Sequence, residues 1–199
     1  MADNMLECQL ESNSEVLDED HMLVYAARQD TEAAGRLFDK YYSEILGYIY
    51  HCTLDGTVTE DLTSNVFLAV FRHLGRYRWR QVPFRAWLYR IATNEVRMHW
   101  RRQKRIKFIS LQPDDDEYVA GSTAADSIET AEEYRFLHKA LLELRIKYRT
   151  VIILRYFEDK KIVEICDITG RKEGTVKSQL HRGLARLQDI LVQWSVLPE

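Results

Sequence analysis

Apolar residues recur every three or four positions through much of this chain, which is the period of an amphipathic helix. A short helix is expected from Asp20, and a second over residues 31–49, where Thr31 could act as the N-cap. Thr59 is placed to cap a third helix, which Gly75 ends. The apolar stripes of the second and third helices are Ala34, Leu37, Phe38, Tyr41, Tyr42, Ile45, Leu46 and Ile49, then Leu62, Val66, Phe67, Val70, Phe71 and Leu74.

A longer helix is predicted over residues 84–103, after a basic and aromatic loop at 76–82 and a proline, Pro83, that suits a first helical turn. Its inward face is apolar and consists of Phe84, Trp87, Leu88 and Ile91. Its outward stripe is polar and basic and consists of Arg90, Asn94, Arg97 and Arg101.

Helices are expected again from about Ile128, and the pattern of the last two predicts a helix-turn-helix. A short helix at 161–168 and a turn at 169–171 lead into a helix at 173–194. The second helix of such a unit lies in the major groove and presents its early residues to base edges. An ordinary helical hairpin with a solvated face is the alternative. The residues expected to face outward are Thr175, Lys177, Ser178, His181 and Arg182.

Charge divides the chain into blocks. Residues 71–109 carry twelve Lys or Arg and one acid, Glu95, although the whole chain has a formal net charge of -3. Residues 1–20 carry seven acids and residues 110–133 carry eight, and neither block has a Lys or Arg. Residues 134–199 carry thirteen Lys or Arg and eight acids and form a second basic block. Two basic blocks separated by an acidic one indicate two nucleic-acid modules and a linker.

The fold expected from these patterns is all-α, with two small helical domains. We expect a disordered acidic tail at 1–19, a helical bundle at 20–107, a flexible acidic linker at 108–130 and the helix-turn-helix domain at 131–195.

Cations interleaved with aromatic residues point to nucleic acid as the partner of the bundle. Arginines neutralise phosphates, and aromatic faces stack on unpaired bases, so single strands are included in the expectation. The alternative is a solvent-exposed helix face without a binding partner. Such a face usually alternates acidic and basic residues, whereas residues 71–109 are almost all basic among their charged positions.

Other classes of protein are disfavoured by what the sequence contains. Cys8, Cys52 and Cys166 are single and far apart, so neither a disulfide framework nor a metal site is expected. No apolar run approaches the roughly 20 residues that span a bilayer, and the acidic start is the reverse of a signal peptide, so we expect a cytoplasmic protein without membrane insertion. We expect no cofactor and no catalytic site; a metal-dependent nuclease using His51, Asp55, Glu60 and Asp61 would lack a recognisable ligand spacing.

Residues 59–102 and 143–188 resemble, in this order, region 2 and region 4 of the extracytoplasmic-function (ECF) sigma factors of bacterial RNA polymerase, in the sigma-70 family. The segments that carry the resemblance include WLYRIATN at 87–94 and GTVKSQLHR at 174–182. The resemblance implies a transcription-initiation factor that binds core RNA polymerase and directs it to a promoter. It also implies that region 4 reads the minus-thirty-five duplex and that region 2 melts the minus-ten element and recognises its non-template strand.

The resemblance assigns site residues in three groups. Core polymerase would be bound by Asp61, Ser64, Asn65 and Leu68. The minus-ten element would be bound by Arg76, Tyr77, Arg78, Trp79, Arg80, Arg90, Asn94, Arg97 and Arg101. The minus-thirty-five duplex would be bound by Arg171, Lys172, Thr175, Lys177, Ser178, His181 and Arg182, of which Lys177 and Arg182 could equally anchor phosphates.

The chain departs from the family pattern at four places. Ser64 and Asn65 stand where Gln-Glu is usual, and Met98 stands where an Asp is common. The usual proline is missing near residues 145–147, and Lys172 replaces a common Ser cap. These departures concern the promoter sequence and the contact with polymerase more than the class of protein.

The resemblance also implies an inhibitory anti-sigma factor, and we expect a monomer when the protein is free. The alternative function is a stand-alone helix-turn-helix regulator whose N-terminal half senses or dimerises. Such a regulator would bind duplex DNA unaided, and its dimers would read paired half-sites.

Overall fold

The computed structural model of the chain describes residues 20–78, 82–109 and 128–194. Every regular element in these ranges is a helix, so the expected all-α class is confirmed. A short helix at 20–26 is followed by α2 (Thr31–Thr53), α3 (Gly56–His73), a 3-10 turn (Leu74–Arg76) and α4 (Phe84–Ile109). The second half holds α5 (Ile128–Glu143), α6 (Ile146–Tyr156), α7 (Ile162–Thr169) and α8 (Glu173–Gln193).

Aspartates, and not threonines, start the first two long helices. The Asp30 carboxylate accepts hydrogen bonds from the backbone N–H groups of Glu32 and Ala33, so Thr31 is the first helical residue and not the cap. Asp55 accepts from the N–H of Val58 in the same way. Thr59 is therefore one turn inside α3, and the prediction that it caps the helix was wrong. Both residue types suit the position, but the aspartate that comes first in the chain captures the free N–H groups.

Helix α4 is longer than predicted, and its buried face includes the predicted Phe84 and Leu88 but extends further around the helix. Its buried residues are Phe84, Ala86, Leu88, Tyr89, Ala92, Thr93 and Val96, whereas Trp87 and Ile91 are only partly buried. Tyr89 lies inside because it packs edge-on against Tyr48 of α2, with 5.1 Å between ring centres. The first half is thus a bundle of α2, α3 and α4 held by aromatic contacts.

The predicted linker falls mostly outside the described residues. Helix α4 continues to Ile109, and α5 begins at Ile128, so both ends of the range 108–130 are helical. Residues 110–127 are not described.

Helices α7 and α8 form the predicted helix-turn-helix. Gly170 joins them in the left-handed conformation, with φ 66°, and its N–H donates to the carbonyl of Cys166. Glycine adopts this conformation without the steric cost that a Cβ would bring. Helix α8 crosses α6 closely at Gly183, where an added Cβ would lie 2.9 Å from Ile152 Cδ1.

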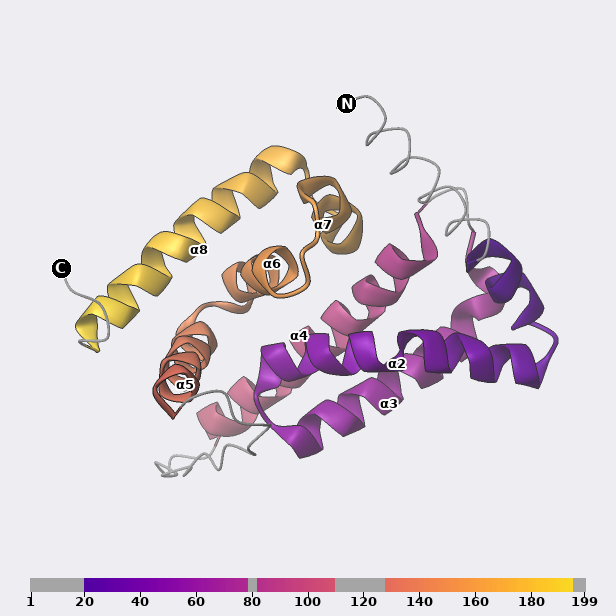
Figure 1. The fold of residues 1–199 in the computed structure, drawn as a ribbon, viewed down its shortest axis with the longest axis horizontal. Coiled ribbons are helices and arrows are strands. Elements are labelled where there is room, and N and C mark those ends of the chain that lie inside the picture. The colour runs from indigo at the N-terminus through magenta and orange to yellow at the C-terminus, as the bar shows by residue number, and fades with distance from the viewer. Residues whose placement is uncertain (1–19, 79–81, 110–127, 195–199) are drawn as a thin grey trace.

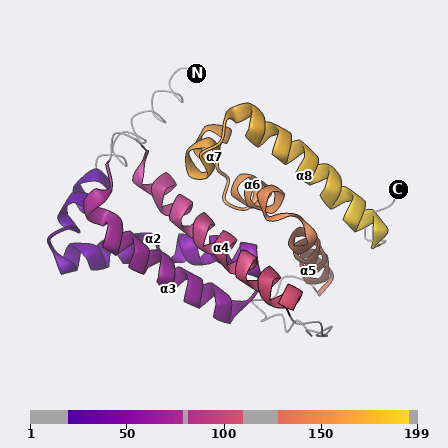
Figure 2. The ribbon, with the colours of Figure 1, turned by 180° about the vertical axis from the view of Figure 1, so that it is seen from behind.

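The second half lies along the first. In both views α6 and α7 lie between α8 and the first half (Figures 1 and 2), and α7 packs directly on α4. Buried apolar residues of the two halves form one continuous core. None of the helices in the described part of the chain has the length and apolar character that a bilayer-spanning helix needs.

The close crossing at Gly183 generates a stability prediction. Gly183→Ala should lower the free energy of unfolding by about 1–3 kcal/mol, since the methyl group would overlap Ile152 in a packed core. Gly47→Ala is the matched control: Gly47 is inside α2 with no atom near its Cβ position, so alanine should stabilise by up to about 1 kcal/mol. Urea unfolding of both variants measures the difference, and equal effects would contradict the close crossing.

Candidate nucleic-acid interface

The four residues assigned to polymerase binding share one exposed face of α3. Asp61, Ser64, Asn65 and Leu68 are all exposed, and Leu68 presents 60% of its surface. Phe71, one turn further on, is also partly exposed at 37%. Leu68 and Phe71 therefore leave apolar surface exposed on the same face of α3 as the three polar residues.

The residues assigned to the minus-ten element are in different environments. Arg76, Arg78, Asn94 and Arg101 are exposed, and Trp79 and Arg80 lie outside the described residues. Tyr77, by contrast, is only 4% exposed. Its ring packs against Trp87 at 4.9 Å and Phe84 at 5.6 Å, and its hydroxyl donates to the carbonyl of Val82. Tyr77 is therefore a core residue in this structure, and its bond to Val82 joins the two ends of the basic loop at 76–82.

Arg90 faces the other half of the protein. Its guanidinium donates to the backbone carbonyl of Asp167 in α7. Its Nε atom is buried and has no hydrogen-bond partner among the described residues. Arg97 is partly buried. Burial, and then the charge of Arg97, lower the pKa of Arg171 at the start of α8.

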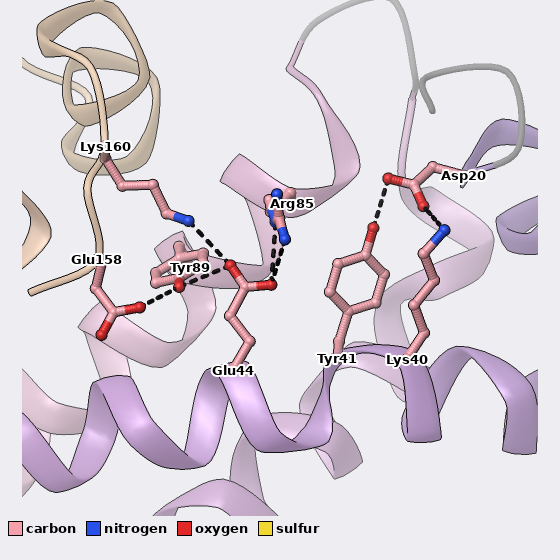
Figure 3. A network of polar contacts seen from close by, with 8 residues as sticks. All are labelled: Asp20, Lys40, Tyr41, Glu44, Arg85, Tyr89, Glu158 and Lys160. Carbon is pink, nitrogen blue, oxygen red and sulfur yellow. Dashed lines mark hydrogen bonds and ion pairs between the residues drawn. The ribbon is translucent and has the colours of Figure 1, made fainter. Parts of the chain in front are cut away.

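A polar cluster centred on Glu44 joins the two halves, and sequence reasoning missed it. The Glu44 carboxylate accepts from Lys160 Nζ at 2.9 Å, from Arg85 NH2 at 2.7 Å and from the Tyr89 hydroxyl at 2.8 Å. The Tyr89 hydroxyl also lies 2.6 Å from a Glu158 oxygen (Figure 3). In the sequence Glu44 is one acid on a helix, and no local pattern marks its partners.

The environment separates the pKa values of the two carboxylates. Burial raises the pKa of Glu44, but Lys160 and Arg85 outweigh it and leave that pKa below its usual value. Burial and the charge of Glu44 raise the pKa of Glu158, against the hydrogen bond from Tyr89. One tyrosine proton serves two carboxylates here, so Glu158 is the weaker of the two acids.

A buried guanidinium, that of Arg149, adds to the contact between the two halves of the protein. Arg149 of α6 donates to the carbonyls of Cys52, Leu142 and Leu144, and it lies over the Trp100 ring with 4.6 Å to the ring centre. Burial lowers its pKa to about 10, so it remains charged at neutral pH. Carbonyls at helix ends carry partial negative charge and can satisfy a cation that has no acid beside it.

A buried histidine, His138, and a partly buried one, His51, pack at the junction of α2 and α5. The ring centres of His51 and His138 are 5.4 Å apart, and Phe157 packs against both. Tyr134 covers His138 with 4.1 Å between ring centres. Burial lowers the pKa of both histidines, and the pKa of His138, which also faces His51, falls to about 4.

The helix-turn-helix presents most of the residues assigned to the minus-thirty-five duplex. Lys172, Thr175, Lys177, His181 and Arg182 are exposed, and Arg171 and Ser178 are partly buried. Lys172 is the N-cap of α8 and makes no side-chain capping bond, as its departure from the usual Ser predicts. Lys177 pairs with Glu173 at 2.5 Å on the surface.

A basic hollow beside α8 adds residues that the sequence did not single out. It measures about 320 Å³ and is lined by Lys147, Tyr148, Gly174, Thr175, Ser178, Gln179 and Arg182. No acid is among these residues. Burial raises the pKa of the Tyr148 hydroxyl, but Lys147, Arg186 and Arg182 lower it by more. A site with cations and no acid fits a phosphate.

The nuclease alternative receives no support from the described residues. Asp55 caps α3 and His51 packs in the aromatic junction. Within residues 20–78, 82–109 and 128–194, no three His, Cys, Asp or Glu side chains gather where a metal ion could bind.

Comparisons with known proteins agree with this arrangement. The family model for sigma-70 region 2 matches residues 37–106, and the model for sigma-70 region 4 matches residues 136–187. The RNA polymerase sigma-H factor of Pseudomonas aeruginosa is 30% identical over 174 residues, which are 83% of this chain and 90% of that protein. The ECF RNA polymerase sigma factor BldN of Streptomyces coelicolor is 28% identical over 163 residues, 81% of this chain and 61% of that protein.

A solved structure shares the fold. The structure of CnrH in complex with the cytosolic domain of CnrY matches with a TM-score of 0.63 and 22% identity, covering 87% of this chain and 97% of that one.

The histidine pair makes stability depend on pH. The unfolded chain takes up a proton at His138 near pH 6.5, and the folded chain only near pH 4. Stability should therefore be full above pH 6.5 and fall as the pH drops toward 4. The melting temperature of the His138→Phe variant should fall less steeply than that of the wild type between pH 7 and 5. The melting temperature of the His181→Phe variant, in which the replaced histidine is exposed, should follow the wild type. Identical pH profiles for all three proteins would refute this role of His138.

Proposed function

We propose a function from the premise that this chain belongs to the ECF group of the sigma-70 family. It is a sigma factor that acts in promoter-directed initiation of transcription. One observation carries the finer proposal: a single chain combines an exposed contact face on α3, a basic α4 and a helix-turn-helix with an exposed polar recognition helix.

Helix α8 is proposed to read the minus-thirty-five duplex. Thr175, Lys177, His181 and Arg182 are exposed on its first three turns, where a recognition helix meets base edges. Arg171 donates to the Gln179 side chain, which fixes the guanidinium beside the helix start. The basic hollow around Lys147 and Tyr148 is proposed to hold a backbone phosphate and so set the register of α8 on the duplex.

Helix α4 and the loop before it are proposed to melt and bind the minus-ten element. Arg90, Asn94, Arg97 and Arg101 supply cations and an amide along one stripe, and Arg76 and Arg78 extend this charge toward the loop. Bases that stack on aromatic side chains would use the loop residue Trp79, since the Tyr77 ring is enclosed.

The exposed face of α3 is proposed to bind core RNA polymerase, and a protein inhibitor is proposed as a second partner. Two solved structures similar to this chain are complexes, one of CnrH with the cytosolic domain of CnrY and one of the sigma factor RpoE with the anti-sigma factor NepR from Bartonella quintana. Exposed apolar side chains such as Leu68 and Phe71 suit either partner.

Run-off transcription tests the function. The protein is mixed with bacterial core RNA polymerase and genomic fragments, including one from upstream of its own gene. We expect discrete start sites that require both proteins, and little specific DNA binding by this chain alone. Sequence-specific binding to duplex DNA without polymerase, together with no transcript, would favour the stand-alone regulator.

Lys147 provides a test of the phosphate site. Lys147→Ala should weaken promoter binding by the polymerase complex equally for matched and mutated minus-thirty-five sequences, and should reduce the slope of log affinity against log salt by about 1. Lys139→Ala, an exposed lysine of α5, is the control and should leave the slope unchanged. A Lys147→Ala effect confined to one minus-thirty-five sequence would mean base readout and not a phosphate contact.

A further inference from the structure

A hollow lies between the short N-terminal helix at 20–26 and the start of the basic loop. It measures about 280 Å³, below the roughly 300–1,000 Å³ of sites for drug-sized ligands, so its size suits a single planar ring system. The residues that line it are His21, Val24, Tyr25 and Arg28 from the N-terminal side and Tyr77 and Arg78 from the loop. The N-terminal four precede residue 37, where the match to the region 2 family model begins.

The short helix is anchored to α2 and presents Tyr25 on its outer side. Val24 is 2% exposed and faces the core, whereas the next residue, Tyr25, is 60% exposed. At the start of the helix, the Asp20 carboxylate accepts from the Tyr41 hydroxyl and pairs with Lys40 at 2.9 Å (Figure 3). A ring on an anchored helix loses little conformational entropy when a ligand packs on it, because its backbone is already ordered.

Arg28 ties this helix to the basic loop. Its Nη2 atom donates to the carbonyl of Tyr77 at 2.9 Å. Arg78 donates from Nη1 to the carbonyls of Gly75 and Tyr77, each at 3.3 Å. Both arginines line the hollow, and no Asp or Glu is among the described residues that line it. Because their partners here are neutral carbonyls, the two guanidinium charges are uncompensated and attract an anion.

An accessible aromatic ring beside two cations is the chemistry of a site for single-stranded nucleic acid. The base of an unpaired nucleotide stacks on the ring, and its phosphates pair with the cations. The Tyr77 ring is only 4% exposed, so the accessible aromatic face of the hollow is that of Tyr25. The hollow also joins the proposed minus-ten surface, because Arg78 belongs to both.

We propose that this hollow is a subsite for one unpaired base of the non-template strand, with the base stacked on Tyr25 and its phosphate bound by Arg28 and Arg78. The subsite deepens the proposed function and rests on it, since it extends the surface proposed for the minus-ten element. It is separate from stacking on Trp79. Stacking is tolerant of sequence, because every base has a π-face, so the subsite stabilises the open strand and does not select one base.

The test changes the ring and keeps everything else. Tyr25→Ala removes the ring, and Tyr25→Phe keeps it. Tyr156→Ala is the matched control, because Tyr156 is 59% exposed and is not among the residues of the hollow. All three changes replace an exposed side chain, so each variant should melt at the wild-type temperature, which checks the fold.

The measurement uses the complex of each protein with core RNA polymerase. The probe is a labelled fork of the promoter that run-off transcription identifies, with the non-template strand of the minus-ten element unpaired, and fluorescence anisotropy gives the affinity. The unpaired nucleotides are then replaced one at a time by abasic nucleotides. Each replacement removes one base and keeps its phosphate.

We expect Tyr25→Ala to weaken binding of the intact fork by about 5- to 150-fold, the range for loss of one base stacked on an aromatic ring. Tyr25→Phe and Tyr156→Ala should bind like the wild type. At one position, an abasic nucleotide should weaken the wild type by a similar factor and leave the affinity of Tyr25→Ala unchanged. Exchange of the base at that position for another base should have little effect.

Three results would overturn the subsite. The first is an unchanged affinity of Tyr25→Ala for the intact fork. The second is a loss of the same size for the intact fork and every abasic fork, because no single base would then depend on the ring. The third is weaker co-elution of Tyr25→Ala with core polymerase, which would make Tyr25 part of a protein contact. All three leave the proposed function intact as long as the wild type transcribes, whereas a wild type that transcribes no fragment removes both.

Discussion

The carboxylate of Glu44 is the charge around which the two halves of this protein meet. A carboxylate that loses much of its water is costly unless donors replace that water. Glu44 is partly buried, and three donors replace its water, two from α4 and one from the turn after α6. The mutual attraction of these charges offsets the cost of removing them from water, with little net gain in stability. Such a contact specifies one arrangement of the halves without making that arrangement permanent.

Arg90 makes a second, weaker contact between the halves. Its guanidinium donates to the backbone carbonyl of Asp167 in α7, and its Nε atom is buried without a hydrogen-bond partner among the described residues. A backbone carbonyl offers less to a guanidinium than a charged acceptor does. The Glu44 cluster, where the acceptor is a carboxylate, is therefore the stronger polar contact of the two.

Local sequence chemistry accounts for much of the candidate site. The exposed face of α3, the glycine turn at 170 and helix α8 follow from periodicity and from residue types that lie within a few positions of one another. The prediction that Thr59 caps α3 was wrong, although the right cap, Asp55, lies only four residues earlier. Aspartate is a better N-cap than threonine, so the residue type alone already favoured Asp55, as it favoured Asp30 over Thr31 at the start of α2.

The sequence by itself determined the all-α class, the sigma-70 resemblance and the positions of most proposed binding residues, since all of these depend on neighbours in the chain. Only the tertiary structure decided that the Tyr77 ring is enclosed, that Arg90 meets Asp167 and that Glu44 meets Lys160. The last two pairs are separated by 77 and 116 positions. Charge patterns and helical periods identify which side chains are polar or exposed on their own helix, but the partner of a side chain is chosen when distant helices pack, where burial and hydrogen bonding decide between acceptors.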